Sequence, residues 1–149
     1  METKSQVKTI PLDEKARRQF EERWNKSETL KYFGVKMALG DDDVVRAVID
    51  PVLPAHRGGM GTDAVNGVVL AGLFDITIGV VGVLQNIGKQ TGTLHLSMSF
   101  MRPTRGNRVT CEARLIKTGQ HLVFVEAKIL DEQQRACAMA QGTCALIDS

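Results

Sequence analysis

Apolar residues are concentrated in one stretch near the middle of the chain, residues 64–84, with the sequence AVNGVVLAGLFDITIGVVGVL. Read as a helix at 100° per residue, this stretch has two faces. The bulky face consists of Val69, Leu70, Leu73, Val80 and Leu84. The other face combines Asp75 with mostly small residues, namely Val68, Ala71, Gly72, Ile78, Gly79 and Gly82. We expect the bulky face to pack on a core and the small face to admit another backbone or a ligand close to Asp75.

A second, more polar helix is predicted near the start of the chain. The segment LDEKARRQFEERWNKS, which follows Pro11, has a narrow apolar stripe at four-residue spacing, formed by Leu12, Ala16, Phe20 and Trp24. We expect this helix to dock on the body of the domain as a lid or strap. Residues 35–50 then predict two strands around a Gly-Asp turn, and a glycine-rich loop, AHRGGMGTD, leads to the central helix.

Alternation of apolar and polar side chains begins after the central helix. In TGTLHLSMSFMRP the apolar side consists of Leu94, Leu96, Met98 and Phe100, and a period of two predicts a strand. The patterns RVTCEARLIK, HLVFVEAKIL and RACAMAQGTCALI follow, separated by the turns TGQ and DEQQ, which is typical of an antiparallel meander. The whole pattern predicts an α+β domain in which a curved sheet wraps one helix.

Length, composition and charge narrow the function classes. At 149 residues, 43% hydrophobic and 24% charged, the chain is expected to form one globular domain, alone or as a subunit. A net charge of +2 with few aromatic residues argues against nucleic-acid binding. The first residues contain no hydrophobic signal and the three cysteines form no CxxC pair, so reduced thiols in a cytoplasm are expected. The three histidines lack metal-ligand spacing, so no metal site is expected.

Asp75 is the only charged residue in the apolar stretch, and three interpretations of it stay open. An ionised carboxylate away from water is costly unless it is paired, neutralised or used in chemistry. The stretch is long enough for a membrane span, but a central Asp is penalised by about 2.5–3.5 kcal/mol on insertion scales. The second interpretation is a buried structural Asp held by hydroxyls such as Thr77. We favour the third, a functional carboxylate in a protein that does not span a membrane.

The order of elements is strand, glycine-bearing loop, apolar helix with one acid, then the segments SFMRPTRGNRV and GQHLVFVEAKILDEQQRACAMAQGT. This order resembles the hot-dog fold acyl-CoA thioesterases of the phenylacetate-pathway type, from about residue 33 to residue 147. The resemblance implies a hot-dog domain over residues 33–149, with residues 1–32 as an N-terminal helical extension. The helix of that family begins with His-Gly-Gly, with an acid nine positions after the His. Here Asn66, Gly67 and Val68 occupy the motif, and Asp75 has the matching spacing.

The resemblance implies hydrolysis of an acyl-CoA thioester to the free acid and CoA, with no cofactor besides the CoA of the substrate. Asp75 is then the nucleophile or the general base, and the Gly67 amide is the oxyanion donor. Asn66 either orients these groups or caps the helix, and capping is the role that its residue type favours. The candidate substrate-binding residues are His56, Asp63 and Val68 around the acyl group, and Arg102 and Arg105, with Arg108 and Lys89 nearby, for the CoA phosphates. His56 and Asp63 also fit simple solvated positions in the loop.

Gly67 and Asp75 are too far apart on one helix to act on one carbonyl. Eight residues correspond to about 12 Å along the axis at about 1.5 Å per residue. Two antiparallel copies of the helix remove this difficulty, so we expect a homodimer, or a tetramer made of two dimers, with composite sites. Two other functions stay open. The altered His-Gly-Gly favours acyl-CoA binding without hydrolysis, and the fold also suits acyl-thioester hydratases or dehydratases, which need a His that the central helix lacks. The acyl group is not predicted.

Overall fold

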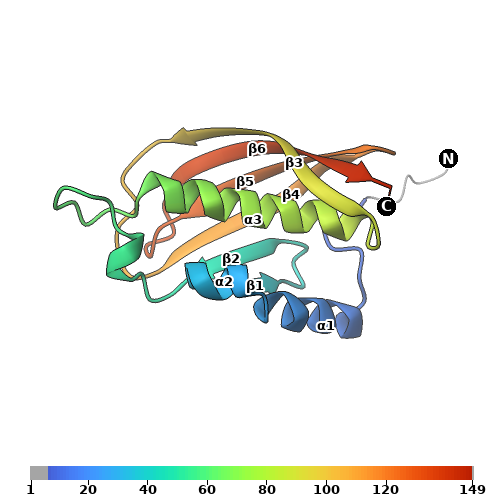
Figure 1. Cartoon of the computed structure of the whole chain (residues 1–149), viewed down its shortest axis with the longest axis horizontal. Coiled ribbons are helices and arrows are strands. Elements are labelled where there is room, and N and C mark those ends of the chain that lie inside the picture. Colours follow the sequence, from blue (N-terminus) through green and yellow to red (C-terminus); the bar gives the residue numbers. More distant parts are fainter. Residues whose placement is uncertain (1–6, 149) are drawn as a thin grey trace.

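Helix α3 (Gly67–Gln85) is formed by the central apolar stretch and lies inside a curved antiparallel sheet (Figure 1). This computed structural model describes residues 7–148. The strands of the sheet are β1 (Val35–Leu39), β2 (Val45–Ile49), β3 (Gln90–Phe100), β4 (Val109–Thr118), β5 (Leu122–Leu130) and β6 (Ala136–Ile147). The predicted α+β architecture is confirmed, and each strand that the sequence predicts is present.

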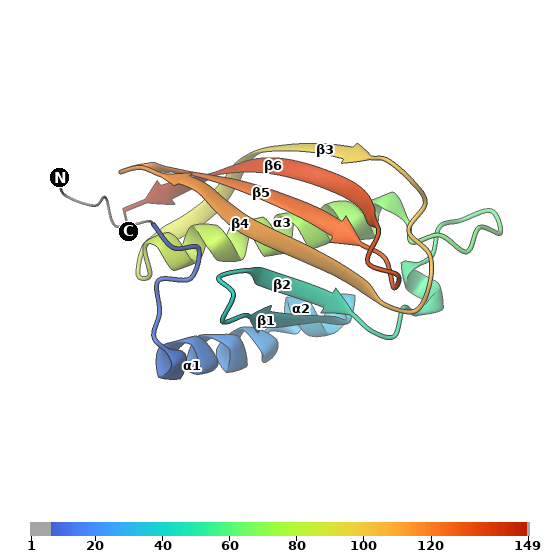
Figure 2. The ribbon, with the colours of Figure 1, turned by 180° about the vertical axis from the view of Figure 1, so that it is seen from behind.

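The strands are arranged in the order β1-β2-β4-β5-β6-β3 (Figure 2). The predicted meander holds for β4, β5 and β6. Strand β3, which precedes them in the chain, lies beside β6, with Ser97 opposite Gln141. The position next to β4 is occupied by β2, with Ala47 opposite Cys111. Side-chain alternation predicts that a segment is a strand but not which strand it pairs with, so this crossing of β3 to the far edge did not follow from the pattern.

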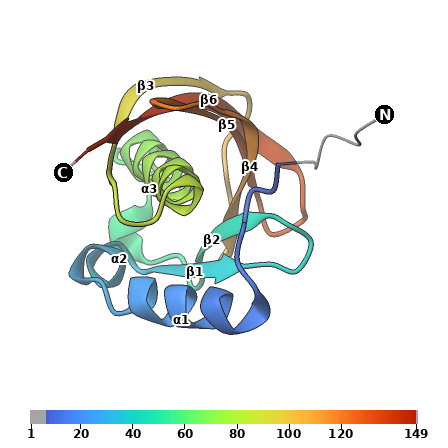
Figure 3. The same cartoon turned by 90° about the vertical axis from the view of Figure 1, so that its right-hand side faces the viewer.

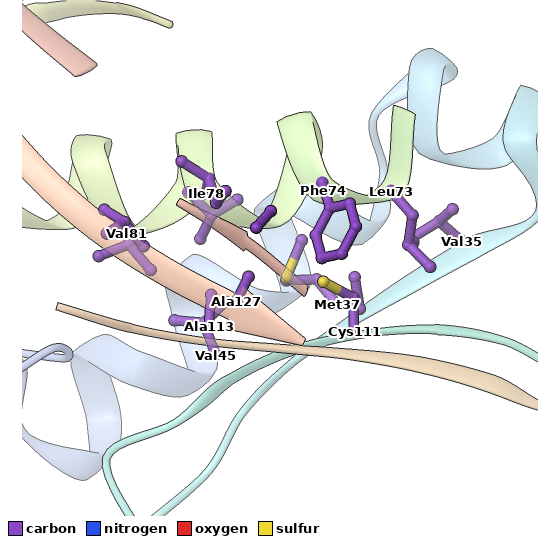
Figure 4. Packing of buried hydrophobic residues seen from close by; sticks show 14 of the residues in the cluster. Val35, Met37, Val45, Leu73, Phe74, Ile78, Val81, Cys111, Ala113 and Ala127 are labelled. Carbon is purple, nitrogen blue, oxygen red and sulfur yellow. The ribbon is translucent and has the colours of Figure 1, made fainter. Parts of the chain in front are cut away.

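Helix α3 fills the concave side of the sheet (Figure 3). Leu73, Phe74 and Ile78 are at most 1% exposed and belong to one cluster with small residues of the sheet such as Ala113 and Ala127 (Figure 4). Burial of each large apolar side chain contributes roughly 1.5–3 kcal/mol. The small residues beneath the helix let it approach the sheet closely, so the curvature of the sheet and the apolar face of α3 form one core.

The open face of α3 is narrower than the sequence predicts. Ile78 and Gly82, which the helical projection places with Asp75, are buried against the sheet. A Cβ added to Gly82 would lie 2.8 Å from Cγ2 of Thr91, and one added to Gly142 of β6 would lie 2.8 Å from Cγ2 of Ile78. The sheet therefore extends further around the helix than a two-face projection assumes. Although α3 has the length and hydropathy of a membrane span, it is the core helix of this fold.

The N-terminal region forms two helices, α1 (Glu14–Asn25) and α2 (Glu28–Phe33), where the sequence predicts one. The break comes at Ser27, whose hydroxyl accepts a hydrogen bond from the amide of Leu30 and so caps the second helix. Gly34 ends α2 at φ 68°, a conformation that glycine adopts readily. The predicted apolar stripe is present, because Phe20 and Trp24 are partly buried against the core.

Polar side chains of α1 cover the outer edge of β1. The side-chain amide of Asn25 accepts a hydrogen bond from the backbone amide of Met37 at 2.8 Å and donates one to its carbonyl at 2.9 Å. Glu21 accepts from the amide of Leu39 at 2.9 Å, and Arg17 donates to the carbonyl of Gly40 at 3.2 Å. These residues recur every four positions and satisfy backbone groups that an edge strand would leave open. Helix α1 is therefore a docked strap, and β3 is left as the open edge of the sheet.

Candidate active site

The N-terminus of α3 leaves one backbone amide free. Asn66 is the N-cap, and its Oδ1 accepts hydrogen bonds from the amides of Val68 at 2.8 Å and Val69 at 3.2 Å, which confirms the predicted capping. Within residues 7–148, the amide of Gly67 has no hydrogen-bond acceptor, and both Gly67 and the side chain of Val68 are exposed. Free amides at this end of a helix favour negative charge. The Gly67 amide is therefore available to an oxyanion.

Asp75 lies two turns further along α3, on the side that the sheet leaves open. Its carboxylate is exposed in the single chain and accepts no hydrogen bond from the residues that the structure describes. Thr77 donates its hydroxyl to the carbonyl of Leu73 at 2.6 Å and so does not hold the carboxylate. Although Asp75 is the one acid of an apolar stretch, its carboxylate is not enclosed by the described chain, because the sheet curves around the other side of the helix. The interpretation as a structural Asp has no contact to support it.

A hollow of about 450 Å³ opens beside Asp75, between α3, the two N-terminal helices and the start of β3. This volume lies within the range of sites for small organic molecules, about 300–1,000 Å³. Its apolar walls are Trp24, Leu30, Ile76 and Val83, with Gly79 between them. Gly79 belongs to the small face that was expected to admit a ligand, whereas Leu30, Ile76 and Val83 were not predicted as part of a site. The available signal was the apolar stripe of the N-terminal helix, which points Trp24 toward the core.

The structure keeps Gly67 and Asp75 apart within one chain. Both lie on α3, eight residues apart, which corresponds to about 12 Å along the helix axis at about 1.5 Å per residue. Gly72, which lies between them, has open space around it, because an added Cβ would meet no atom of residues 7–148 within 4 Å. The Gly67 amide and the Asp75 carboxylate thus lie on the open side of the helix, but they are too far apart to act on the same carbonyl group.

His56 is a buried residue whose ring nitrogens are both engaged inside the chain. Nδ1 accepts a hydrogen bond from the amide of Leu53 at 2.9 Å, which leaves Nε2 to donate to the carbonyl of Phe33 at 2.8 Å. The ring ties the end of α2 to the segment that precedes the loop of residues 57–64. In this geometry His56 is 6% exposed and offers no free ring nitrogen to a substrate.

The arginines of the β3–β4 loop lie next to the start of α3, because the carbonyl of Thr104 accepts a hydrogen bond from the amide of Val65 at 2.8 Å. Arg105 pairs with Asp63 at 2.8 Å, and this guanidinium lowers the pKa of the Asp63 carboxyl. Arg108 pairs with Asp50 at 3.1 Å. Arg102 is exposed and forms no ion pair with the described residues. Of the predicted phosphate-binding arginines, Arg102 is therefore the one whose charge is unmatched.

Lys89 does not belong to this group, contrary to the expectation from sequence. It pairs with Asp148 at 2.9 Å and lies before β3, whereas the arginine loop follows that strand. The eleven residues of β3 separate the two ends by about 35 Å at about 3.3 Å per residue. Proximity in sequence was misleading here because an extended strand covers a long distance.

Other groups with reactive chemistry lie in the core. Cys111, Cys137 and Cys144 are free and buried, and burial raises the pKa of the Cys111 thiol to about 12. Such thiols are poor nucleophiles at neutral pH. Residues 7–148 contain no cluster of three His, Cys, Asp or Glu side chains suited to a metal ion.

A second hollow, of about 450 Å³, lies on the convex side of the sheet. Its walls include charged residues of neighbouring strands, such as Glu112, Arg114, Glu126 and Lys128. The sheet separates this hollow from α3, so it has no access to Asp75 or Gly67.

Comparisons with known proteins place these features in a family context. The family model of the thioesterase superfamily matches residues 63–138, which include Gly67, Asp75 and the arginine loop. The medium/long-chain acyl-CoA thioesterase YigI of Salmonella typhimurium is 25% identical over 104 residues, 60% of this chain and 67% of that protein.

Solved structures share the fold over most of the chain. A thioesterase from Haemophilus influenzae has a TM-score of 0.78 and 20% identity, and the match covers 96% of both chains. The PaaI protein from the phenylacetic acid degradation operon of Escherichia coli has a TM-score of 0.76 and 18% identity, covering 91% of this chain and 95% of its own.

Proposed function

The chain belongs to the thioesterase superfamily and has the hot-dog fold, and from this premise we propose that it hydrolyses acyl-CoA thioesters to the free acid and CoA. One observation carries the proposal. Among the described residues, the Asp75 carboxylate has no hydrogen-bond partner and lies at a hollow, and the first amide of the same helix, that of Gly67, is also free. The name of the YigI relative supports an acyl-CoA substrate with a medium or long acyl chain.

The active unit in this proposal is a dimer with two composite sites. Helix α1 covers the edge at β1, whereas β3 is an open edge on which Leu94 and Phe100 are 64% and 52% exposed. Long open edges tend to pair with another strand. Two copies of α3 that run antiparallel and cross near Ala71, midway between Gly67 and Asp75, bring each Gly67 to the Asp75 of the other subunit. The small residues at the crossing allow close approach, and a tetramer of two such dimers has the same sites.

The reaction then uses one group from each subunit. The Gly67 amide, at the positive end of its helix, stabilises the negative charge that develops on the thioester oxygen. Asp75 of the other subunit either attacks the carbonyl carbon, forming an acyl-enzyme that water hydrolyses, or removes a proton from the attacking water. The carbon–sulfur bond breaks, and the products are the carboxylic acid and CoA. This route requires no metal or further cofactor.

The CoA portion is proposed to lie over the β3–β4 loop. That loop touches the residue before Asn66, so it is adjacent to the Gly67 end of the site. Arg102 is the best placed cation because it has no ion-pair partner within the described chain, whereas Arg105 would have to leave Asp63 to bind a phosphate. Asn66 uses its side-chain oxygen Oδ1 as the helix cap, and its side-chain NH2 is proposed to donate to the thioester oxygen.

A thiol-release assay across an acyl-CoA panel tests the proposed function. Asp75→Asn keeps the shape but removes the charge, and we expect turnover to fall by at least about two orders of magnitude. Gly67→Pro removes the free amide at a helix position that tolerates proline, and we expect a loss of about 100-fold or more. Asp41→Asn, in the exposed β1–β2 turn, is the matched control and is expected to be fully active.

Two outcomes would contradict the proposal. Full activity of Asp75→Asn would show that the carboxylate takes no part in the chemistry. Calorimetric binding of acyl-CoA without thiol release by the wild-type protein would instead identify a non-catalytic binder, the alternative that Asn66 and Val68 in place of the family motif favour.

A further inference from the structure

The hollow beside Asp75 is bounded by segments that are far apart in the sequence. Trp24 comes from α1 and Leu30 from α2, whereas Ile76, Gly79 and Val83 come from the second half of α3. The carboxylate lies at one end of this row of α3 residues and Val83 at the other. The N-terminal helices therefore form a wall of the same space that the carboxylate faces, and they are more than a cover for the sheet edge.

Gly79 is conspicuous in this hollow because nothing in the fold requires a glycine there. An added Cβ would meet no atom of the described residues within 4 Å, in contrast to Gly82, where it would lie 2.8 Å from Thr91 and 3.0 Å from Cys144. Glycine disfavours helix formation relative to alanine. Gly82 is explained by close packing on the sheet, whereas Gly79, one turn beyond Asp75, keeps the hollow open next to the carboxylate.

The opposite wall, Trp24, has a fixed position. Its neighbour Asn25 is hydrogen-bonded to both the amide and the carbonyl of Met37. The Phe20 ring lies against the indole, with ring centroids 5.9 Å apart. Glu21 holds the preceding turn to the amide of Leu39. The indole therefore belongs to a helix that is hydrogen-bonded along a strand. A side chain that limits the size of a site has to be held in place in this way.

We propose that the acyl chain of the substrate lies in this hollow, that Gly79 admits it and that Trp24 limits its length and bulk. This inference rests on the proposed function, because the thioester carbonyl is taken to be at Asp75. The eight residues from Asp75 to Val83 span about 12 Å at about 1.5 Å per residue. Since an extended polypeptide advances about 3.5 Å over three backbone bonds, an extended chain of that length has about ten bonds. The hollow therefore suits an unbranched apolar acyl group of about ten carbons.

The test compares kcat/KM for straight-chain acyl-CoA substrates from butyryl to palmitoyl. For Gly79→Leu we expect the decanoyl to butyryl ratio to fall by about tenfold or more, since a misfit of one or two methylene groups is worth that much in an apolar pocket. For Trp24→Ala we expect the preferred chain to lengthen by at least two carbons. Tyr32→Ala, an aromatic residue on α2 that is 85% exposed and does not line the hollow, is the control and keeps the wild-type profile.

Because ratios within one variant do not depend on the folded fraction, partial unfolding cannot imitate the expected result. Unchanged chain-length profiles in Gly79→Leu and Trp24→Ala would overturn the inference while leaving the hydrolase assignment intact. If Gly79→Leu lost kcat/KM equally on all substrates and also dissociated into monomers, the inference would be overturned. A second copy of the chain would then be the occupant of the hollow. If the wild-type protein released no thiol, the proposed function would fail, and the calorimetric decanoyl-CoA to butyryl-CoA affinity ratio of the same variants would decide the inference.

Discussion

His56 shows how burial changes the meaning of a residue that looks reactive in sequence. Its two hydrogen bonds, to the amide of Leu53 and the carbonyl of Phe33, join the end of α2 to the segment before the loop. A buried polar group that loses its partner costs roughly 1–3 kcal/mol. We therefore expect His56→Ala to lower the free energy of unfolding in urea by about 2 kcal/mol or more, with two backbone groups left unpaired.

The control for this prediction is His121→Ala, which removes an exposed imidazole before β5 and is expected to leave stability unchanged. The kcat of folded His56→Ala on its best acyl-CoA is expected to stay within a few-fold of the wild-type value. A large loss of kcat without a loss of stability would return His56 to the role of a substrate contact.

Gly82 and Gly79 offer a matched comparison at the same scale. Both are helical glycines of α3, three positions apart, but only Gly82 faces close neighbours, Thr91 and Cys144. Overpacking a well-filled core typically costs about 1–3 kcal/mol, whereas replacing an unconstrained helical glycine by alanine gains about 1 kcal/mol. We expect Gly82→Ala to lower the melting temperature and Gly79→Ala to preserve or raise it. A stabilised Gly82→Ala would mean that the helix and sheet are further apart than the structure has them.

At the scale of elements, the hydrogen bonds between α1 and β1 predict that stability depends on the side chain of Asn25. Asn25 makes two of these bonds, with the amide and the carbonyl of Met37. We expect Asn25→Ala to lower the free energy of unfolding by about 1–3 kcal/mol, because both backbone groups lose a buried partner. Arg18→Ala, which loses only an exposed pair with Glu14, is expected to change it by no more than about 0.5 kcal/mol. If denaturant titrations gave the same change in unfolding free energy for Asn25→Ala and Arg18→Ala, α1 would not stabilise the edge of the sheet as proposed.

The elements also show what the sequence alone could and could not predict. Periodicity located α3, all six strands and the apolar stripe of α1, because each signal is local and is written in consecutive residues. The pairing of β3 with β6 and the wall formed by Trp24 depend on contacts between distant segments, which no local period encodes. Asp75 was singled out because it is the one acid in an apolar run, whereas Gly67 was singled out through the resemblance of residues 66–68 to the family motif, and both roles stay predictions. The polar row of α1 that bonds the edge of β1, formed by Arg17, Glu21 and Asn25, was not predicted. Its four-residue spacing is the same as that of the apolar stripe beside it.

At the scale of the whole molecule, the two edges of the sheet have different roles. One is closed by α1, and the other, β3, carries exposed apolar side chains on a strand of eleven residues. Among the described residues, β3 is therefore the sheet edge that is free to pair with another strand. That side is also where α3 presents Asp75 and Gly72, so pairing at β3 brings the open faces of two helices together. The proposed composite site thus needs no change in the fold of either subunit.

This arrangement predicts that two inactive variants restore each other. In a dimer of one Asp75→Asn chain and one Gly67→Pro chain, one site combines an intact Gly67 with an intact Asp75, while the other site carries both substitutions. A statistical mixture is half heterodimer, so the specific activity should recover to about a quarter of the wild-type value, from single variants with almost none. Two affinity tags and sequential purification isolate the heterodimer, for which the expected value is about half of the wild-type activity. Should the purified heterodimer be no more active than its parents, Gly67 and Asp75 do not meet across the interface, because a site contained in one subunit is broken in both chains and gains nothing from mixing.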